Sequence, residues 1–310
     1  MNKHIFLDNL TANIGKLAAG KKNYFSQSID SPGFKKLIRS IEVSVPAIIG
    51  EGVYKVETDC KADLNEPAVF VAKWMDEKHP TLIYHHGNNE RPFDFGKMSK
   101  NTFARIFMAQ KDLFPLNLIV VRAPFHHCRL CEYKEKMTEL GNFTLMLSVS
   151  VLVNEAIIVL LKKRSNAPIV TSGISLGGWI TNLHKGLFGT SEVYIPLMAG
   201  TLLGELFLQS KYSRMVSDLA LNHPEKIRKI LNFDEIFQNY KMPEVYPLLA
   251  VYDQFIQFGI QKISYVGYPL KTLSAGHVTG AMKSEQIRNH ILNVLENLQN
   301  TTVPEIVQDR

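Results

Sequence analysis

Ser175 stands at the centre of the pentapeptide GISLG, where its side chain could act as a nucleophile. A G-x-S-x-G sequence between a strand and a helix is typical of a sharp turn that exposes the serine hydroxyl. Gly173 and Gly177 would let the strand and the helix approach closely. Apolar residues precede the pentapeptide and recur at helical spacing after it, which fits this context. A Gly-rich turn with a buried, unreactive serine is the alternative.

A serine hydroxyl needs a base at neutral pH, and histidine held by a carboxylate suits that task. Ser175, Asp253 and His277 stand along the chain in the order nucleophile, carboxylate, base that such a turn requires. Asp253 and His277 each follow a segment that we expect to be a strand, and the carboxyl ends of parallel strands gather at one edge of a sheet. We therefore expect the three side chains to meet.

Asp253 and His277 could also have non-catalytic roles. Asp253 could cap a helix at 254–261, and His277 could be a histidine of the core or the surface. Asp218 and Asp234 are rival carboxylates, but both fall in a segment that we expect to be an insertion.

The loop HHGNN follows an expected strand at 81–84 and is a candidate for binding negative charge. The oxyanion formed in acyl transfer needs two N–H donors. We predict the N–H of Leu176, at the start of a helix, and the N–H of Asn88, with Gly87 allowing an unusual backbone. His85 and His86 are interpreted as structural residues that bond to loop carbonyls.

The sequence HHCRLC, with His126, His127, Cys128 and Cys131, invites a metal interpretation. Zinc sites pair a C-x-x-C with a second pair of ligands further along the chain, and no such pair is evident. We expect no metal, and the role of the cysteine pair stays open. The sequence holds no G-x-G-x-x-G or P-loop, so we expect no cofactor.

From residue 80 onward, apolar β-rich segments alternate with helical ones, which predicts an α/β fold with a mostly parallel sheet and helices on both faces. The expected strands are 81–84, 116–122, 169–173, 193–197, 248–252 and 269–273, and the expected helices are 101–114, 142–164, 176–187 and 282–298. Before them, the short runs 43–49, 53–56 and 68–74 suit antiparallel strands at the edge of the sheet.

The length of 310 residues suits a single domain, 1–310, with two additions. Residues 1–40 are expected to form a helical N-terminal extension. Residues 201–242 interrupt the alternation of strands and helices and are expected to form a helical cap or lid over the sheet.

The composition indicates which binding partners and which cellular compartment to expect. The net charge of +6 is spread along the chain, so we expect no nucleic acid partner. Three cysteines do not suggest a disulfide framework, and the first twenty residues lack the apolar run of a signal peptide, so we expect a cytoplasmic protein. The apolar run 143–161 is long enough to span a membrane but contains Glu155, so we expect a buried helix and no stable membrane insertion. The oligomeric state stays open.

With HHGNN, GISLGG, Asp253 and SAGH in this order, residues 80–298 resemble the α/β-hydrolase superfamily. The chain looks most like uncharacterised bacterial esterase- or peptidase-like members with a doubled glycine after the elbow, here Gly177 and Gly178. The resemblance implies Ser175 as nucleophile, His277 as base, Asp253 as its acid, and Leu176 with Asn88 as oxyanion hole. The loop at 122–127 departs from the acidic, Gly-rich turn of many relatives, which weakens any detailed substrate analogy.

The resemblance implies a serine hydrolase that cleaves an ester, thioester or amide of a small acyl substrate through an acyl-enzyme. A carboxylesterase (EC 3.1.1) is favoured, because ester hydrolysis demands least of these parts, and the Leu, Phe and Tyr of 201–242 suggest an apolar substrate portion. A non-catalytic binding protein with this fold and a membrane-associated, lipase-like protein are the alternatives.

Overall fold

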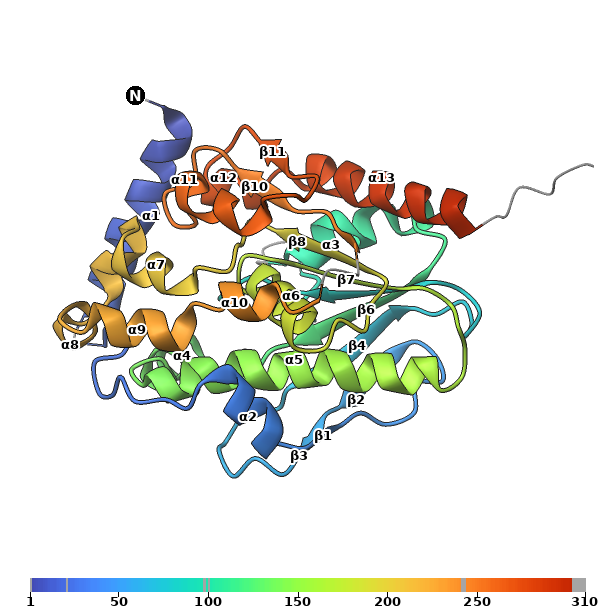
Figure 1. Cartoon of the computed structure of the whole chain (residues 1–310), viewed down its shortest axis with the longest axis horizontal. Coiled ribbons are helices and arrows are strands. Elements are labelled where there is room, and N and C mark those ends of the chain that lie inside the picture. Colours follow the sequence, from blue (N-terminus) through green and yellow to red (C-terminus); the bar gives the residue numbers. More distant parts are fainter. Residues whose placement is uncertain (1, 21, 97–98, 100, 241–243, 303–310) are drawn as a thin grey trace, which may run out of the picture.

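A nine-stranded sheet runs through the middle of the computed structural model, which describes residues 2–20, 22–96, 99, 101–240 and 244–302 (Figure 1). Its strand order is β11-β10-β8-β7-β5-β6-β4-β2, with β9 paired to β8, and β1 and β3 form a separate two-stranded sheet. The strands are β1 Val43–Ser44, β2 Gly52–Lys55, β3 Glu57–Thr58, β4 Ala68–Lys73, β5 Thr81–His85, β6 Asn117–Arg122, β7 Ile169–Ile174, β8 Val193–Leu197, β9 Glu244–Val245, β10 Leu248–Ala250 and β11 Lys271–Leu273.

The sheet is parallel at its centre and antiparallel at one edge. Strands β6, β5, β7, β8, β10 and β11 run parallel to one another, whereas β4 and β2 pair antiparallel beside β6. The central strands β5, β7 and β8 are buried along their whole length, which explains their continuous apolar sequences. The predicted α/β sheet is therefore confirmed, and the expected runs 53–56 and 68–74 form its antiparallel edge as β2 and β4. The expected edge strand at 43–49 is wrong, because this run contributes only β1, which pairs with β3 in the separate sheet.

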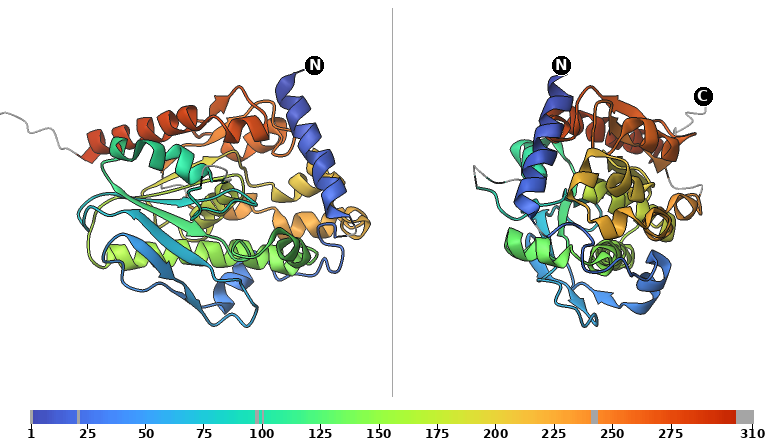
Figure 2. Two further views of the ribbon diagram at one scale, coloured as in Figure 1. Left: turned by 180° about the vertical axis from the view of Figure 1, so that it is seen from behind. Right: turned by 90° about the vertical axis from the view of Figure 1, so that its left-hand side faces the viewer.

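Helices cover both faces of the sheet, as two opposite views show (Figures 1 and 2). Helices α5 and α6 pack on one face, and α3 and α13 lie on the other. The helices are α1 Lys3–Ala19, α2 Phe34–Ser40, α3 Thr102–Ile106, α4 Leu130–Lys136, α5 Leu140–Lys162, α6 Leu176–Leu187, α7 Leu203–Leu208, α8 Asp218–Leu221, α9 Pro224–Leu231, α10 Asp234–Phe237, α11 Phe258–Gln261, α12 His277–Ala281 and α13 Ser284–Thr302, with 3-10 turns η1 Met108–Leu113, η2 Lys211–Met215 and η3 Lys262–Tyr265.

Two predicted helices differ from the structure. The helix expected at 101–114 ends at Ile106, and Gln110 breaks the following turn with φ −144° and ψ 46°. This break lets Phe114 fold back onto Phe107, with ring centroids 5.1 Å apart in the core. The terminal helix expected at 282–298 is α13, which begins at Ser284 and ends at Thr302. A separate short helix, α12, begins at His277 and precedes it.

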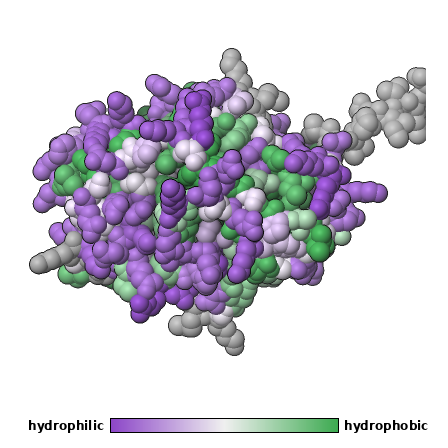
Figure 3. All heavy atoms as spheres, turned by 90° about the horizontal axis from the view of Figure 1, so that it is seen from below, coloured by the Kyte–Doolittle hydropathy of each residue, from purple (hydrophilic) through white to green (hydrophobic). Residues whose placement is uncertain are grey.

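Helix α5 is the apolar segment that raised the question of a membrane span. Among the residues that the structure describes, it alone is long and apolar enough to cross a bilayer, yet 72% of its most apolar window is buried inside the protein. It packs between α6 on one side and α2 with β1 on the other. The surface on the α2 side mixes hydrophilic and hydrophobic residues (Figure 3). This environment is typical of the core helix of a globular domain.

Helix α1 of the N-terminal addition lies at the same end of the molecule as α7 and η2 of the segment 201–240, whereas α2 lies beneath α5 (Figure 1). Helix α1 packs against η2 and α12, and α2 packs against α5. The segment 201–240 forms α7, η2, α8, α9 and α10. Residues 241–242 of the predicted cap and residues 1 and 21 of the predicted N-terminal extension lie outside the described residues. Helix α1 and the segment 201–240 therefore lie beside the carboxyl ends of the central strands, where both can line a site (Figure 1).

Candidate active site

Ser175 sits at the tip of the turn between β7 and α6 in a backbone conformation that non-glycine residues rarely adopt, with φ 54° and ψ −110°. Its N–H donates to the carbonyl oxygen of Leu197 in the neighbouring strand β8 at 2.9 Å. Strain of this kind persists only where the surroundings enforce it, and it is concentrated at functional sites. The turn holds the Ser175 side chain at the carboxyl end of the sheet.

The glycines around Ser175 make this close-packed turn sterically possible. A Cβ atom on Gly173 would lie 2.5 Å from the backbone of Gly177, and one on Gly178 would lie 2.6 Å from the Cβ atom of Ala199. Strand, turn and helix approach so closely that no side chain fits between them. The spacing of glycines around Ser175 therefore has a steric cause in this chain.

The structure brings Ser175, His277 and Asp253 into one hydrogen-bonded row. The Ser175 Oγ atom lies 3.1 Å from Nε2 of His277, and Nδ1 of His277 lies 2.7 Å from Oδ2 of Asp253. Asp253 is 3% exposed, and the His277 side chain is 18% exposed. A single imidazole thus links a hydroxyl on the pocket side to a buried carboxylate.

Asp253 uses its second oxygen to shape its own loop. Its Oδ1 accepts hydrogen bonds from the N–H groups of Phe255 and Ile256, each at 2.8 Å. Asp253 does not cap a helix at 254–261, because α11 begins at Phe258; the carboxylate instead caps the turn before it with one oxygen and holds His277 with the other.

Opposing effects act on the pKa of His277. Burial is the largest single effect and lowers the pKa, but the charge and hydrogen bond of Asp253 together with the carboxylates of Asp8 and Glu90 outweigh it, so the pKa is raised overall. Carboxylates stabilise the imidazolium that forms when Nε2 takes a proton.

The two predicted oxyanion donors lie beside this row. Leu176 is the first residue of α6, and both Leu176 and Asn88 line the same pocket as Ser175 and His277. The reason given for Gly87 is wrong, because its φ is outside the left-handed region, whereas Asn89 has φ 60°. Gly87 is needed for space instead, since a Cβ there would lie 2.8 Å from Oε1 of Glu90.

Asn88 is held by a cluster of tyrosines that the sequence did not reveal. Tyr133 donates to its Oδ1 at 2.5 Å, and its Nδ2 donates to the hydroxyls of Tyr24 and Tyr212 at 3.2 and 3.3 Å. Tyr212 in turn donates to Tyr24 at 2.7 Å. The four residues come from widely separated parts of the chain, so no local pattern could have linked them.

His85 and His86 are buried beside the loop after β5 and bond to its carbonyl groups, as expected from the sequence. The Nδ1 atom of His86 donates to the carbonyl oxygen of Gly87 at 2.7 Å, and its Nε2 accepts from Ala123 N–H at 3.1 Å. Burial, together with neighbouring His126, lowers the pKa of His86 well below its usual range, and burial lowers that of His85 to about 3. Both rings are neutral, and His86 ties the loop after β5 to the end of β6.

The HHCRLC residues have separate partners. Nε2 of His126 accepts from Asn89 N–H at 3.4 Å, His127 contacts Glu66 at 3.1 Å, and Cys128 donates to Phe125 O at 3.0 Å, while Cys131 is exposed. Among the described residues, no group of three or more His, Cys, Asp or Glu side chains is arranged to hold a metal ion.

A pocket of about 580 Å³ opens beside Ser175. Its walls come from α1, from the loop after β5, from α4 and α5, and from the segment 201–240. The apolar residues that line it include Ile14, Phe143, Trp179, Leu203, Leu206, Phe207, Met215 and Phe255. Polar groups lie at Ser175, His277 and the Asn88 cluster, and the charged residues Lys22, Glu90, Arg105 and Lys134 also contribute to the lining, so the pocket suits a partly apolar molecule whose polar group lies at Ser175.

Asp8 is a second carboxylate near the row that the sequence did not single out. It is fully buried in α1 and accepts hydrogen bonds from backbone N–H groups next to Asp253 and at His277. A lone acid in an N-terminal helix gives no sequence signal of this kind, because its partners lie 246 and 269 residues away.

No protein-family model matches the chain, and no curated protein matches it by sequence. Its structure is similar to that of Est1E from Butyrivibrio proteoclasticus, with a TM-score of 0.52 and 15% identity over 80% of this chain and 100% of that one. It is also similar to the acetyl xylan esterase from Paenibacillus sp. R4, with a TM-score of 0.51 and 10% identity over 84% of this chain and 92% of the esterase.

A third similar structure is the acylaminoacyl peptidase of Pyrococcus horikoshii, with a TM-score of 0.54 and 14% identity over 87% of this chain. The match spans 43% of the length of the peptidase. Esterases and acylaminoacyl peptidases belong to the α/β-hydrolase superfamily. The similarity of this chain to all three structures agrees with its mostly parallel sheet. The prediction from the sequence is therefore confirmed for the fold: this chain has the α/β-hydrolase fold.

Proposed function

We propose that this protein is a serine hydrolase that cleaves a carboxylic ester through an acyl-enzyme. The observation that carries the proposal is the row Ser175–His277–Asp253, with contacts of 3.1 and 2.7 Å, at a strained turn facing a pocket of about 580 Å³. A hydroxyl, an imidazole and a buried carboxylate in this order are the parts that nucleophilic acyl transfer needs.

In the first half of the reaction, Oγ of Ser175 attacks the acyl carbon while Nε2 of His277 accepts the hydroxyl proton. Asp253 stabilises the resulting imidazolium through Nδ1. The N–H groups of Leu176 and Asn88 bind the oxyanion of the tetrahedral intermediate. The C–O bond to the leaving alcohol then breaks, the alcohol takes the proton from His277, and the acyl group stays on Ser175.

In the second half, water replaces the alcohol. His277 removes a proton from the attacking water, a second tetrahedral intermediate forms, and the bond from the acyl carbon to Oγ breaks. The proton returns from His277 to Ser175 as the carboxylic acid leaves. The net reaction consumes one ester and one water and gives one acid and one alcohol.

The pocket favours a substrate with an apolar acyl or alcohol portion. Side chains such as Trp179, Phe207 and Met215 line it around the polar centre at Ser175. We propose a carboxylesterase in preference to an amidase, because an alcohol is a better leaving group than an amine for a site built from these parts. The free cysteines Cys60, Cys128 and Cys131 suit the reducing cytoplasm that we propose as its compartment.

Turnover of p-nitrophenyl butyrate by the wild type and by Ser175→Ala tests this proposal. We expect the wild type to release p-nitrophenol and Ser175→Ala to lose nearly all of that activity while keeping its melting temperature. A folded wild type without turnover on a panel of esters, thioesters and aminoacyl substrates would favour the alternative, a binding protein with this fold. Equal turnover by both proteins would refute the role of Ser175.

A further inference from the structure

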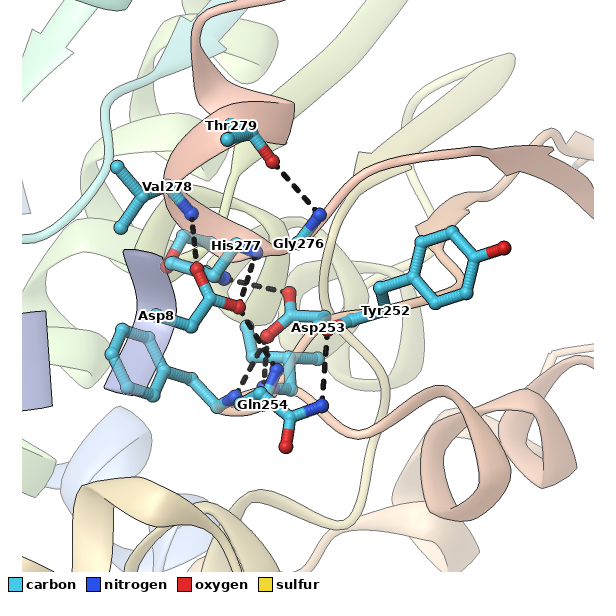
Figure 4. A network of polar contacts seen from close by, with 11 residues as sticks. Asp8, Tyr252, Asp253, Gln254, Gly276, His277, Val278 and Thr279 are labelled. Atoms are coloured by element: carbon cyan, nitrogen blue, oxygen red, sulfur yellow. Dashed lines mark hydrogen bonds and ion pairs between the residues drawn. The ribbon is translucent and has the colours of Figure 1, made fainter. Parts of the chain in front are cut away.

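Asp8, in the N-terminal helix α1, bonds to both loops that carry the acid and the base of the row (Figure 4). Its Oδ2 accepts from the N–H of Gln254 at 3.1 Å and from the N–H of His277 at 2.8 Å, and its Oδ1 accepts from the N–H of Val278 at 3.0 Å. Gln254 directly follows Asp253. One carboxylate therefore adds a further polar link between two loops that are also joined by the Asp253–His277 contact and by the hydrogen bond from the N–H of Tyr252 to the carbonyl oxygen of Ala275 at 2.9 Å.

The burial of Asp8 makes this arrangement costly to hold without its partners. The side chain is 0% exposed, and a buried carboxylate is tolerated only where hydrogen bonds replace its hydration. Three backbone N–H groups supply that replacement. Hydrogen bonds to a charged acceptor are about twice as strong as neutral ones, so they fix the positions of the two loops more firmly than an amide would.

Other contacts dock α1 against the same loops. Nδ1 of His4 lies 2.8 Å from Oγ1 of Thr279, which also accepts from the N–H of Gly276 at 2.9 Å. The His4 ring stacks on Tyr252 with centroids 5.8 Å apart and planes 2° apart. A Cβ on Gly276 would lie 2.7 Å from Oδ2 of Asp8, so the base loop has a glycine where the carboxylate must approach.

We propose that Asp8 is a positioning residue of the active site, which sets the distance between the loops of Asp253 and His277 and makes α1 an integral part of the catalytic apparatus. This inference rests on the proposed serine hydrolase activity. Asp8 does not touch the reacting atoms; it acts through the backbone of His277 and Gln254.

The charges around His277 give a readout that does not depend on turnover and that weakening of α1 without loss of charge would not change. The carboxylates that face it are Asp253, Asp8 and Glu90, and each raises its pKa. Replacing Asp8 with asparagine keeps the size and one acceptor oxygen but removes one of the three charges. The pKa of His277 should then fall, whatever happens to the stability of the fold.

The test compares Asp8→Asn with Ala12→Gly in the full chain. Ala12 is also buried in α1 but lies outside the pocket and the Asp8 network, so Ala12→Gly weakens the helix without touching either loop. We expect Asp8→Asn to lower kcat/KM for p-nitrophenyl butyrate roughly 10- to 100-fold, mainly through kcat, because small misplacements of catalytic groups have effects of this size. Ala12→Gly should stay within about twofold of the wild type at a temperature where it is folded.

Titration of the His277 imidazole by NMR separates this inference from the proposed function, because it needs no substrate. A lower pKa in Asp8→Asn than in both the wild type and Ala12→Gly shows that the Asp8 carboxylate acts on His277 even if no ester is turned over, and a larger loss of kcat in Asp8→Asn than in Ala12→Gly then supports the positioning role. An unchanged pKa, or equal losses of kcat in Asp8→Asn and Ala12→Gly, overturns it. Should Asp8→Asn fail to fold, Gly276→Ala displaces the same carboxylate from the opposite side, with the same expected and contrary results.

Discussion

A Cβ atom on Gly177 would lie 2.0 Å from the carbonyl oxygen of His85. The first turn of α6 thus rests directly on the end of β5, so the helix that follows Ser175 is packed against the strand that leads into the Asn88 loop. This contact couples the geometry of Ser175 to that of Asn88, although the two residues are 87 positions apart in the sequence.

Gly177→Ala should therefore destabilise the protein and impair the site together. Backbone atoms must move to admit the methyl group, at a cost of about 1–3 kcal/mol or more in the free energy of unfolding. We expect a lower melting temperature and slower labelling of Ser175 by a fluorophosphonate. Gly259→Ala is the matched control, because a Cβ at Gly259 meets no atom within 4 Å. Equal behaviour of the two variants would contradict this account of the turn.

The raised pKa of His277 predicts the acid limb of the pH–rate profile. Only the neutral imidazole can accept the Ser175 proton, and the neighbouring carboxylates keep the ring protonated to a higher pH than usual. Activity should therefore rise with pH through a midpoint above about 6.5, the ordinary value for histidine. The profile of kcat/KM in buffers of constant ionic strength measures it.

Asp253→Asn should change that profile in two ways. Removing the charge lowers the pKa of His277, so the midpoint moves to lower pH, while loss of the oriented tautomer lowers kcat by roughly 10³- to 10⁴-fold. An acid limb that stays in place in Asp253→Asn would mean that another group titrates in this range.

The sequence predicted the sheet, its antiparallel edge and the residues of the row, because each rests on a local pattern. Continuous apolar strands, the glycines around Ser175 and polar residues at strand ends are all readable within a few positions. The break at Gln110 was not predictable, since it depends on the packing of Phe114 against Phe107.

The hydrogen bonds that support the site could not be predicted from the sequence, because they also depend on tertiary packing. Asp8 meets Gln254 and His277 only after the first helix has docked on the last third of the chain. Asn88 likewise depends on Tyr24, Tyr133 and Tyr212 from three separate segments. Such long-range hydrogen bonds have no spacing that a single sequence reveals.

Filling the pocket should select against long acyl chains. Leu206 lines the pocket, whereas Leu208 in the same short helix does not, and both are half-buried. Leu206→Trp should lower kcat/KM for p-nitrophenyl octanoate by roughly tenfold relative to the acetate, because lost apolar contacts of 1–3 kcal/mol correspond to such ratios. Leu208→Trp should leave the ratio of the two substrates unchanged, and a shift of equal size there would argue against this pocket as the acyl site.

Tyr133→Phe tests the support of the oxyanion loop. The variant removes the hydrogen bond to Oδ1 of Asn88 and keeps the ring. We expect kcat to fall roughly two- to tenfold with little change in KM, as loss of one hydrogen bond of about 0.5–1.5 kcal/mol implies. Tyr54→Phe removes a distant hydroxyl that donates to Gly50 O and should have no effect. An equal kcat in Tyr133→Phe and the wild type would separate the tyrosine cluster from catalysis.

In the proposed mechanism His277 and Asp253 activate the hydroxyl of Ser175 for attack, and covalent labelling tests this activation most directly. Wild-type protein treated with a fluorophosphonate and digested for mass spectrometry should carry the adduct on Ser175, at a rate that falls sharply in His277→Ala and to zero in Ser175→Ala. Folded wild-type protein that remains unlabelled at Ser175, or that reacts equally fast without His277, would contradict the account.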